Sequence, residues 1–160
     1  MLLSLLKGNA TEKYSYPETL YKSPEIPDYS SFKERKRLSG PSLRQFFKIT
    51  KDWKVCQKDA RFLLGGITNK CLKQLSLNPE GRILNRDQLL RVTTIIAIDN
   101  SLRNILDRAH ANRWAQTTSR VSWLCGRTPL SAMVDGGILT MWELRRLLEA
   151  LASNCNEAER

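Results

Sequence analysis

The chain has 160 residues, a length that fits one large domain or two small ones. Hydrophobic residues make up 41% and charged residues 26% of the sequence, close to the averages of globular proteins, so most of the chain should fold. The formal net charge is +10, and an excess of this size is typical of proteins with an acidic partner, most often nucleic acid.

Several classes of protein are excluded by what the sequence lacks. No apolar run approaches the roughly 20 residues of a membrane-spanning helix, and the start at Met1–Leu6 lacks the basic leader of a signal peptide. We therefore expect a cytoplasmic protein that has no membrane partner. The four cysteines form no Cys-x-x-Cys pair and His110 is the only histidine, so we expect no metal, no cofactor and no enzymatic activity.

The basic residues are distributed unevenly along the chain. Residues 41–84 carry a net charge of +6, against +2 for residues 1–40 and +2 for residues 85–160. Every lysine lies at or before Lys73, and only arginine follows it. Because lysine suits loose contact with phosphates and arginine suits carboxylates and protein interfaces, this segregation indicates two different surfaces. The alternative is that these residues are ordinary solvated helix faces.

Residues 1–40 are predicted to form an irregular N-terminal arm. Residues 7–40 contain all four tyrosines and half of the prolines, without a sustained apolar period. So many tyrosines suggest that the arm lies against the folded body or a partner. The arm ends in the basic run 33–37, which either touches a phosphate backbone or is merely solvated.

Residues 41–84 have the outline of a helix-turn-helix domain. A first helix starts at Ser42, with Pro41 in its first turn and its bulky residues on one face: Leu43, Phe46, Phe47 and Trp53. A second helix covers residues 55–64 and stops at Gly65-Gly66, after which Thr68 caps a short basic third helix.

This outline supplies candidate DNA contacts. An asparagine can pair with adenine through two hydrogen bonds, lysines neutralise phosphates, and a short helix fits the major groove. The candidates are Thr68, Asn69, Lys70 and Lys73 of the third helix, with Lys58 and Arg61 of the second contacting phosphates. The alternative is that the helix pair is only a structural device.

Residues 85–160 are predicted to form a second helical region. Asn85–Gln88 resembles a capping box and opens the longest helix, of roughly 22 residues at 1.5 Å each, and residues 108–116 continue helically. Thr128 and Pro129 start a short helix that ends at Asp135-Gly136-Gly137, and Thr140 with Glu143 caps a last helix through residue 152. We find no convincing strand, so the expected fold class is all-α.

This second half resembles a known family. The long helix from Leu84, the region of Trp114, the Gly-Arg-Thr-Pro-Leu element at 126–130, Asp135-Gly136 and the leucine-rich last helix are similar to the toxin-binding domain of Xre/MbcA/ParS antitoxins. Including the Xre-like helix-turn-helix, the resemblance covers about residues 50–152. It departs from the family at Ser119–Trp123, at the doubled glycine and in the length of the arm.

The resemblance implies a non-enzymatic protein with two partners. Such antitoxins bind and block the active site of RES-domain toxins, which degrade NAD or transfer ADP-ribose, and many repress their own promoter as a complex with the toxin. The implied toxin contacts are Arg127, Trp142, Arg145 and Arg146. The tail 153–160 is a candidate plug, in which Glu157, Glu159 and the terminal carboxylate would mimic the diphosphate of NAD, or Arg160 would enter the cleft.

Other interpretations stay open at this point. Trp142 is alternatively a core residue, and Trp53, Trp114 and Trp123 are most simply core residues. A stand-alone helix-turn-helix transcription regulator without a toxin is the second hypothesis, and a structural helical adaptor is the third. A homodimer is expected in either regulatory case, because the long apolar helix and the small helix-turn-helix are incompletely buried by one chain.

Overall fold

The computed structural model describes residues 27–158, with side chains through residue 154. This part of the chain contains helices and no strand, which confirms the all-α prediction. No helix in it is long and apolar enough to cross a membrane. The helices are α1 (Phe32–Asp52), α2 (Gln57–Leu63), α3 (Asn69–Leu77), α4 (Arg86–Ile105), α5 (Arg108–Trp114) and α6 (Pro129–Ala158), with short 3-10 turns η1 (Pro79–Gly81) and η2 (Ser122–Leu124).

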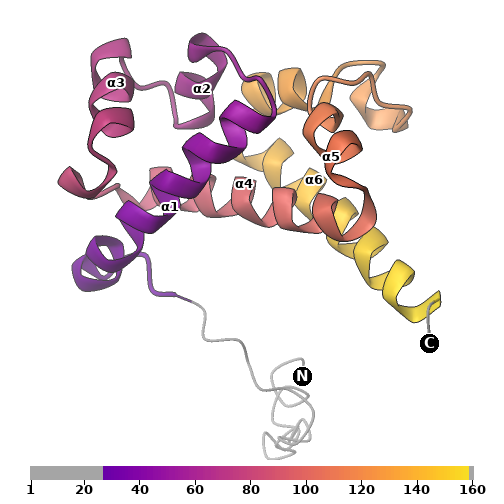
Figure 1. Cartoon of the computed structure of the whole chain (residues 1–160), viewed down its shortest axis with the longest axis horizontal. Coiled ribbons are helices and arrows are strands. Elements are labelled where there is room, and N and C mark those ends of the chain that lie inside the picture. The colour runs from indigo at the N-terminus through magenta and orange to yellow at the C-terminus, as the bar shows by residue number, and fades with distance from the viewer. Residues whose placement is uncertain (1–26, 159–160) are drawn as a thin grey trace, which may run out of the picture.

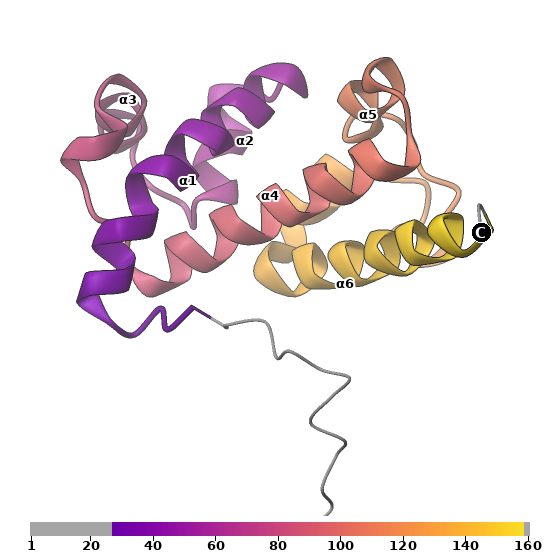
Figure 2. The ribbon, with the colours of Figure 1, turned by 60° about the horizontal axis from the view of Figure 1, so that its bottom comes forward.

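Helix α4 is the element against which the others are arranged. It packs against α1 on one side and against α6 on the other, as Figure 1 and Figure 2 show. Its start confirms the predicted capping box: Asn85 accepts from the backbone N–H of Gln88, and the Gln88 side chain accepts from that of Asn85. Helix α4 ends at Ile105, and Asp107 caps a new helix, α5. The expected helical continuation is therefore a separate helix.

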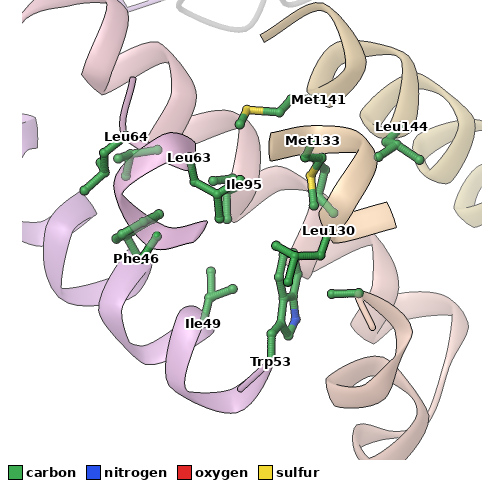
Figure 3. Close-up of a cluster of buried hydrophobic side chains, with 14 of the residues drawn as sticks. Phe46, Ile49, Trp53, Leu63, Leu64, Ile95, Leu130, Met133, Met141 and Leu144 are labelled. Atoms are coloured by element: carbon green, nitrogen blue, oxygen red, sulfur yellow. The ribbon is translucent and has the colours of Figure 1, made fainter. Parts of the chain in front are cut away.

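The buried apolar residues form one cluster that extends through both predicted regions. Figure 3 shows side chains from α1, α2, α4 and α6 meeting there: Phe46, Ile49, Trp53, Leu63, Leu64, Ile95, Leu130, Met133, Met141 and Leu144. Because α2 and the start of α6 share this core, α2 is fixed against the C-terminal helices as well as against its own neighbours.

The expectation of an irregular arm as far as residue 40 is wrong for its last nine residues. Helix α1 begins at Phe32, and Pro41 lies inside it rather than in its first turn. The Ser31 hydroxyl caps the helix by accepting from the N–H of Glu34, and Arg35 donates to the carbonyl oxygens of Tyr29 and Ser30. These bonds start the helix early. A single proline on its exposed side then removes only one backbone donor.

The arm does touch the folded body where the structure describes it. The Tyr29 hydroxyl donates to Oγ1 of Thr93 on α4, at 3.3 Å, and its ring packs against the core. The other three tyrosines, Tyr14, Tyr16 and Tyr21, lie outside the described residues.

Both expected C-terminal helices are present, and they join directly at a kink within α6. Helix α6 runs from Pro129, capped by Thr128 as predicted, and bends at Gly137, whose φ of 61° and ψ of −144° favour glycine. The Thr140 side chain packs against Gly136, where a Cβ would clash. Thr140 therefore lies inside the helix, and the prediction that it caps a new helix is wrong. The doubled glycine makes the bend instead.

Ser39 ties α1 to the start of α4. Its buried hydroxyl donates to the carbonyl oxygen of Arg35 at 2.6 Å and accepts from the backbone N–H of Leu84 at 2.8 Å. The Leu84 residue is itself buried, so no water is available to replace the serine.

We expect Ser39→Ala to lower the free energy of unfolding by about 1 to 3 kcal/mol, because it leaves the buried Leu84 N–H without a partner. The measurement is chemical denaturation. Ser153→Ala is the matched control: its exposed hydroxyl makes the same kind of bond, to the carbonyl of Glu149, and its loss should change stability by less than about 0.5 kcal/mol. Equal effects would show that the Leu84 contact contributes nothing.

A buried carboxylate on α4 depends on one arginine. The Asp99 side chain is only 1% exposed, and its Oδ2 accepts from Nε of Arg103 at 2.7 Å. Arg103 also reaches Asp52 of α1 at 3.3 Å and Asn112 of α5 at 3.5 Å. The hydrogen bond to Asp99 raises the pKa of Arg103, so Arg103 stays charged at neutral pH.

We expect Arg103→Met to destabilise the fold by about 3 kcal/mol, because it leaves the Asp99 charge buried and unpaired. Arg113→Met is the control. It removes a guanidinium group that is exposed to solvent on α5, and it should change the free energy of unfolding by less than about 0.5 kcal/mol. The measurement is the denaturant midpoint of each variant, compared with that of the wild type. A loss below 1 kcal/mol for the Arg103 variant would contradict the prediction.

Candidate functional site

Helices α2 and α3 are joined by a rigid glycine turn. Gly65 and Gly66 have φ of +88° and +79°, and their N–H groups donate to the carbonyl oxygens of Phe62 and Arg61, which closes the end of α2. The Thr68 hydroxyl then accepts from the N–H of Cys71 at 3.2 Å and caps α3, as predicted. The orientation of α3 is thus set by backbone geometry as well as by the core.

Three of the predicted DNA contacts lie together on α3. Asn69, Lys70 and Lys73 are exposed and line a groove of about 660 Å³ between α3, α2 and the end of α1. Gln57, at the start of α2, faces the same groove and was not among the predicted residues. Its sequence signal is its spacing from Ala60, Leu64 and Gly65, which resembles that of Xre-like helix-turn-helix motifs. The walls are partly apolar, and Leu77 of α3 is 76% exposed.

The other three predicted contacts lie outside this groove. Nε of Arg61 donates to the carbonyl oxygen of Ile67 at 2.6 Å, so Arg61 braces the turn before α3. The Thr68 hydroxyl is occupied by its cap. Lys58 lines a different groove, of about 620 Å³, between α2 and the start of α6, together with Asp59 and Asp135. The structure therefore brings together Asn69, Lys70 and Lys73 and separates Lys58 from them.

The outer face of α6 carries exposed apolar side chains. Leu139 is 67% and Trp142 is 41% exposed, and both lie just after the kink at Gly137. The interpretation of Trp142 as a core residue is therefore wrong. The same holds for Trp123 in η2, which is 43% exposed and lines a shallow hollow with Arg146 and Leu147 of α6. Trp53 is fully buried, and Trp114 packs against it.

The predicted arginines of this region make weak ion pairs on the surface. Arg145 pairs with Glu149 at 2.6 Å and Arg146 with Glu143 at 3.4 Å, both within α6. Arg127 reaches Asp135 at 3.5 Å across the start of the helix. Exposed pairs of this kind contribute little to stability, so a partner's carboxylates can replace the intrahelical ones at small cost.

The tail residues are beyond what the structure describes in detail. Helix α6 continues to Ala158, so the backbone of Glu157 is helical. The side chain of Glu157 and all of Glu159 and Arg160 lie outside the described residues. Their proposed role as a plug stays a prediction.

No group of three or more histidine, cysteine or carboxylate side chains among the described residues is placed to hold a metal ion. His110 is exposed, and its Nδ1 lies 2.6 Å from Oδ2 of Asp107. Hydrogen bonds from the His110 backbone and ring lower the pKa of Asp107, which caps α5. This pair is explained by helix capping.

Comparisons with known proteins identify no relative. No protein-family model, no curated protein and no solved structure matches this chain.

Proposed function

We propose that this chain is the antitoxin of a type II toxin–antitoxin system, which binds a RES-domain toxin and blocks its active site. The observation that carries the proposal is the outer face of α6, where Leu139 and Trp142 are exposed beside arginines. Tryptophan and arginine are enriched at the centres of protein interfaces, and solvent-exposed tryptophans are otherwise uncommon. The family resemblance includes this helix.

The manner of blocking follows from the position of the tail. The outer face of α6 would dock beside the toxin's cleft, and the chain beyond residue 153 would reach into it. A cleft that binds the diphosphate of NAD offers cationic or N–H donors, which the carboxylates of Glu157 or Glu159 would satisfy. If Arg160 enters instead, it meets the carboxylates of the cleft.

The DNA-binding half of the proposal concerns α3. Asn69, Lys70 and Lys73 are exposed on a short helix that follows a rigid turn, which suits insertion into the major groove. Repression of the chain's own promoter would then accompany toxin binding. We propose that a homodimer presents two such helices to a two-fold symmetric site.

A stand-alone transcription regulator is the competing hypothesis, and one experiment separates the two. The chain is purified at native level from its host, and the proteins that stay bound through a high-salt wash are identified by mass spectrometry. A RES-domain protein in near-stoichiometric amount, whose toxicity the chain relieves on co-expression, supports the antitoxin. Its absence from cells that contain the chain favours the regulator.

We expect Trp142→Ala to weaken binding of the RES-domain protein roughly 30-fold, about 2 kcal/mol, because exposed tryptophans at interface centres carry much of the binding energy. The measurement is calorimetry of the two purified proteins. Phe62→Ala is the control: Phe62 is 42% exposed, as Trp142 is, but lies on α2. Equal affinities of the wild type and the Trp142 variant would remove this face from the interface.

We expect Lys70→Ala with Lys73→Ala to weaken binding to promoter DNA and to reduce its salt slope by roughly one unit per lost phosphate contact. The slope comes from titrations at several salt concentrations. Lys58→Ala serves as the comparison within the same region, because Lys58 lines the other groove. A slope that is unchanged by the double substitution would show that α3 does not face the DNA.

A further inference from the structure

The outward side of α1 is almost entirely basic. Eight residues of this helix are exposed, and apart from Phe32 and Pro41 all of them are lysine or arginine: Lys33, Lys36, Arg37, Arg44, Lys48 and Lys51. No exposed residue of α1 is acidic. We call these six residues the α1 basic face.

Most of the basic face lies along one line of the helix. Lys33, Arg37, Arg44, Lys48 and Lys51 follow one another at spacings of four, seven, four and three residues, so they share one side of the helix. From residue 33 to residue 51 this side is about 27 Å long at 1.5 Å per residue. The opposite side of α1 is buried in the core, so the helix cannot turn this face inward.

Little of this charge is neutralised by neighbouring carboxylates. Arg37 pairs with Glu34, and Arg44 pairs with Glu80 of η1. Lys33, Lys48 and Lys51 have no carboxylate oxygen within 4 Å among the described residues. A row of like charges on one face repels itself, which favours binding of an anionic partner.

We propose that the α1 basic face binds the phosphate backbone of duplex DNA, alongside the groove contact made by α3. The inference rests on the proposed DNA binding and extends it to a second surface. Duplex DNA carries one negative charge per roughly 1.7 Å of its axis, so a basic row of this length lies opposite many phosphates. Lysines suit such contacts, which give affinity and orientation without reading bases.

The basic face and α3 are joined in the structure. Arg44 contacts Glu80 in the turn that directly follows α3, and Phe47 of α1 lines the same groove as Asn69 and Lys70. Figure 1 shows α1 and α3 at the same end of the molecule, away from the C-terminal end of α6. One duplex can therefore meet both surfaces.

The chemistry of α1 favours DNA over an anionic membrane. A helix that binds a bilayer surface inserts its apolar side into the lipid. The apolar side of α1 is occupied by the core, and Phe32 and Pro41 are the only uncharged residues on its exposed side. A bilayer would therefore meet charged side chains with only Phe32 and Pro41 among them, and no apolar side of α1 is free to insert.

The test removes three positive charges at a time from the full chain. The α1 variant is K33Q/K48Q/K51Q, and the matched control is R120Q/R145Q/R146Q, which removes three charges from the C-terminal half of the chain. Affinities for the promoter duplex and for a scrambled duplex are measured at several salt concentrations. Vesicles of phosphatidylcholine with phosphatidylserine are titrated in parallel. Circular dichroism melting verifies the fold, and the single variants K48Q and K51Q replace the triple variant if it melts early.

We expect the α1 variant to lose two to three units of salt slope, at about 0.9 per phosphate contact, and to weaken equally on both duplexes. The control should keep the wild-type slope. The inference is overturned if the wild type binds DNA but the salt slope is unchanged in the α1 variant, or is reduced as much in the control variant. The DNA-binding proposal itself would then still stand. A wild type that binds no duplex overturns both. Lysine-dependent binding to vesicles but not to duplex assigns the face to a membrane and overturns the inference.

Discussion

The burial of α4 on two sides is the constraint on which the rest of the structure depends. A helix that packs against both α1 and α6 must be apolar over much of its circumference, and α4 meets this with Leu89, Val92, Ile95, Ile98 and Leu102. The side chain of Arg91 on α4 lies beside both the Gly65 turn and the Gly137 kink, so α4 also supports these two bends. The two candidate surfaces are therefore held by a shared support.

The parts of the fold that could be predicted are those controlled by local chemistry. The caps at Thr68, Asn85 and Thr128 and the stop at Gly65-Gly66 follow from residue types at fixed offsets, and the structure has all of them. The early start of α1 was missed because Pro41 is a usual helix start. Ser31 with Glu34 three residues later is also a local start signal, and it is the one that the structure uses.

The candidate sites were predictable only in part, because exposure is a tertiary property. A tryptophan among leucines is typical of a core position, yet Trp142 on α6 and Trp123 on the short turn η2 are both exposed. On α2, Arg61 and Lys58 are of the residue types that typically contact phosphates. Arg61 donates a hydrogen bond to the carbonyl oxygen of Ile67, and Lys58 lines the groove between α2 and α6. Neither placement can be predicted from the spacing of residues in the sequence.

The segregation of lysine from arginine acquires a spatial meaning in this fold. Every described lysine is exposed and lies on α1, α2, α3 or the turn after α1, whereas the arginines of α6 lie beside exposed tryptophans. Figure 1 places α3 and the C-terminal end of α6 at opposite ends of the molecule. A duplex on the α1 and α3 surfaces would thus leave the outer face of α6 uncovered. Since α2 shares one core with α6, the two candidate surfaces belong to one packed unit. If both proposals hold, a toxin that shifted α6 would also shift the helices facing the duplex, and the two binding equilibria would be coupled in both directions.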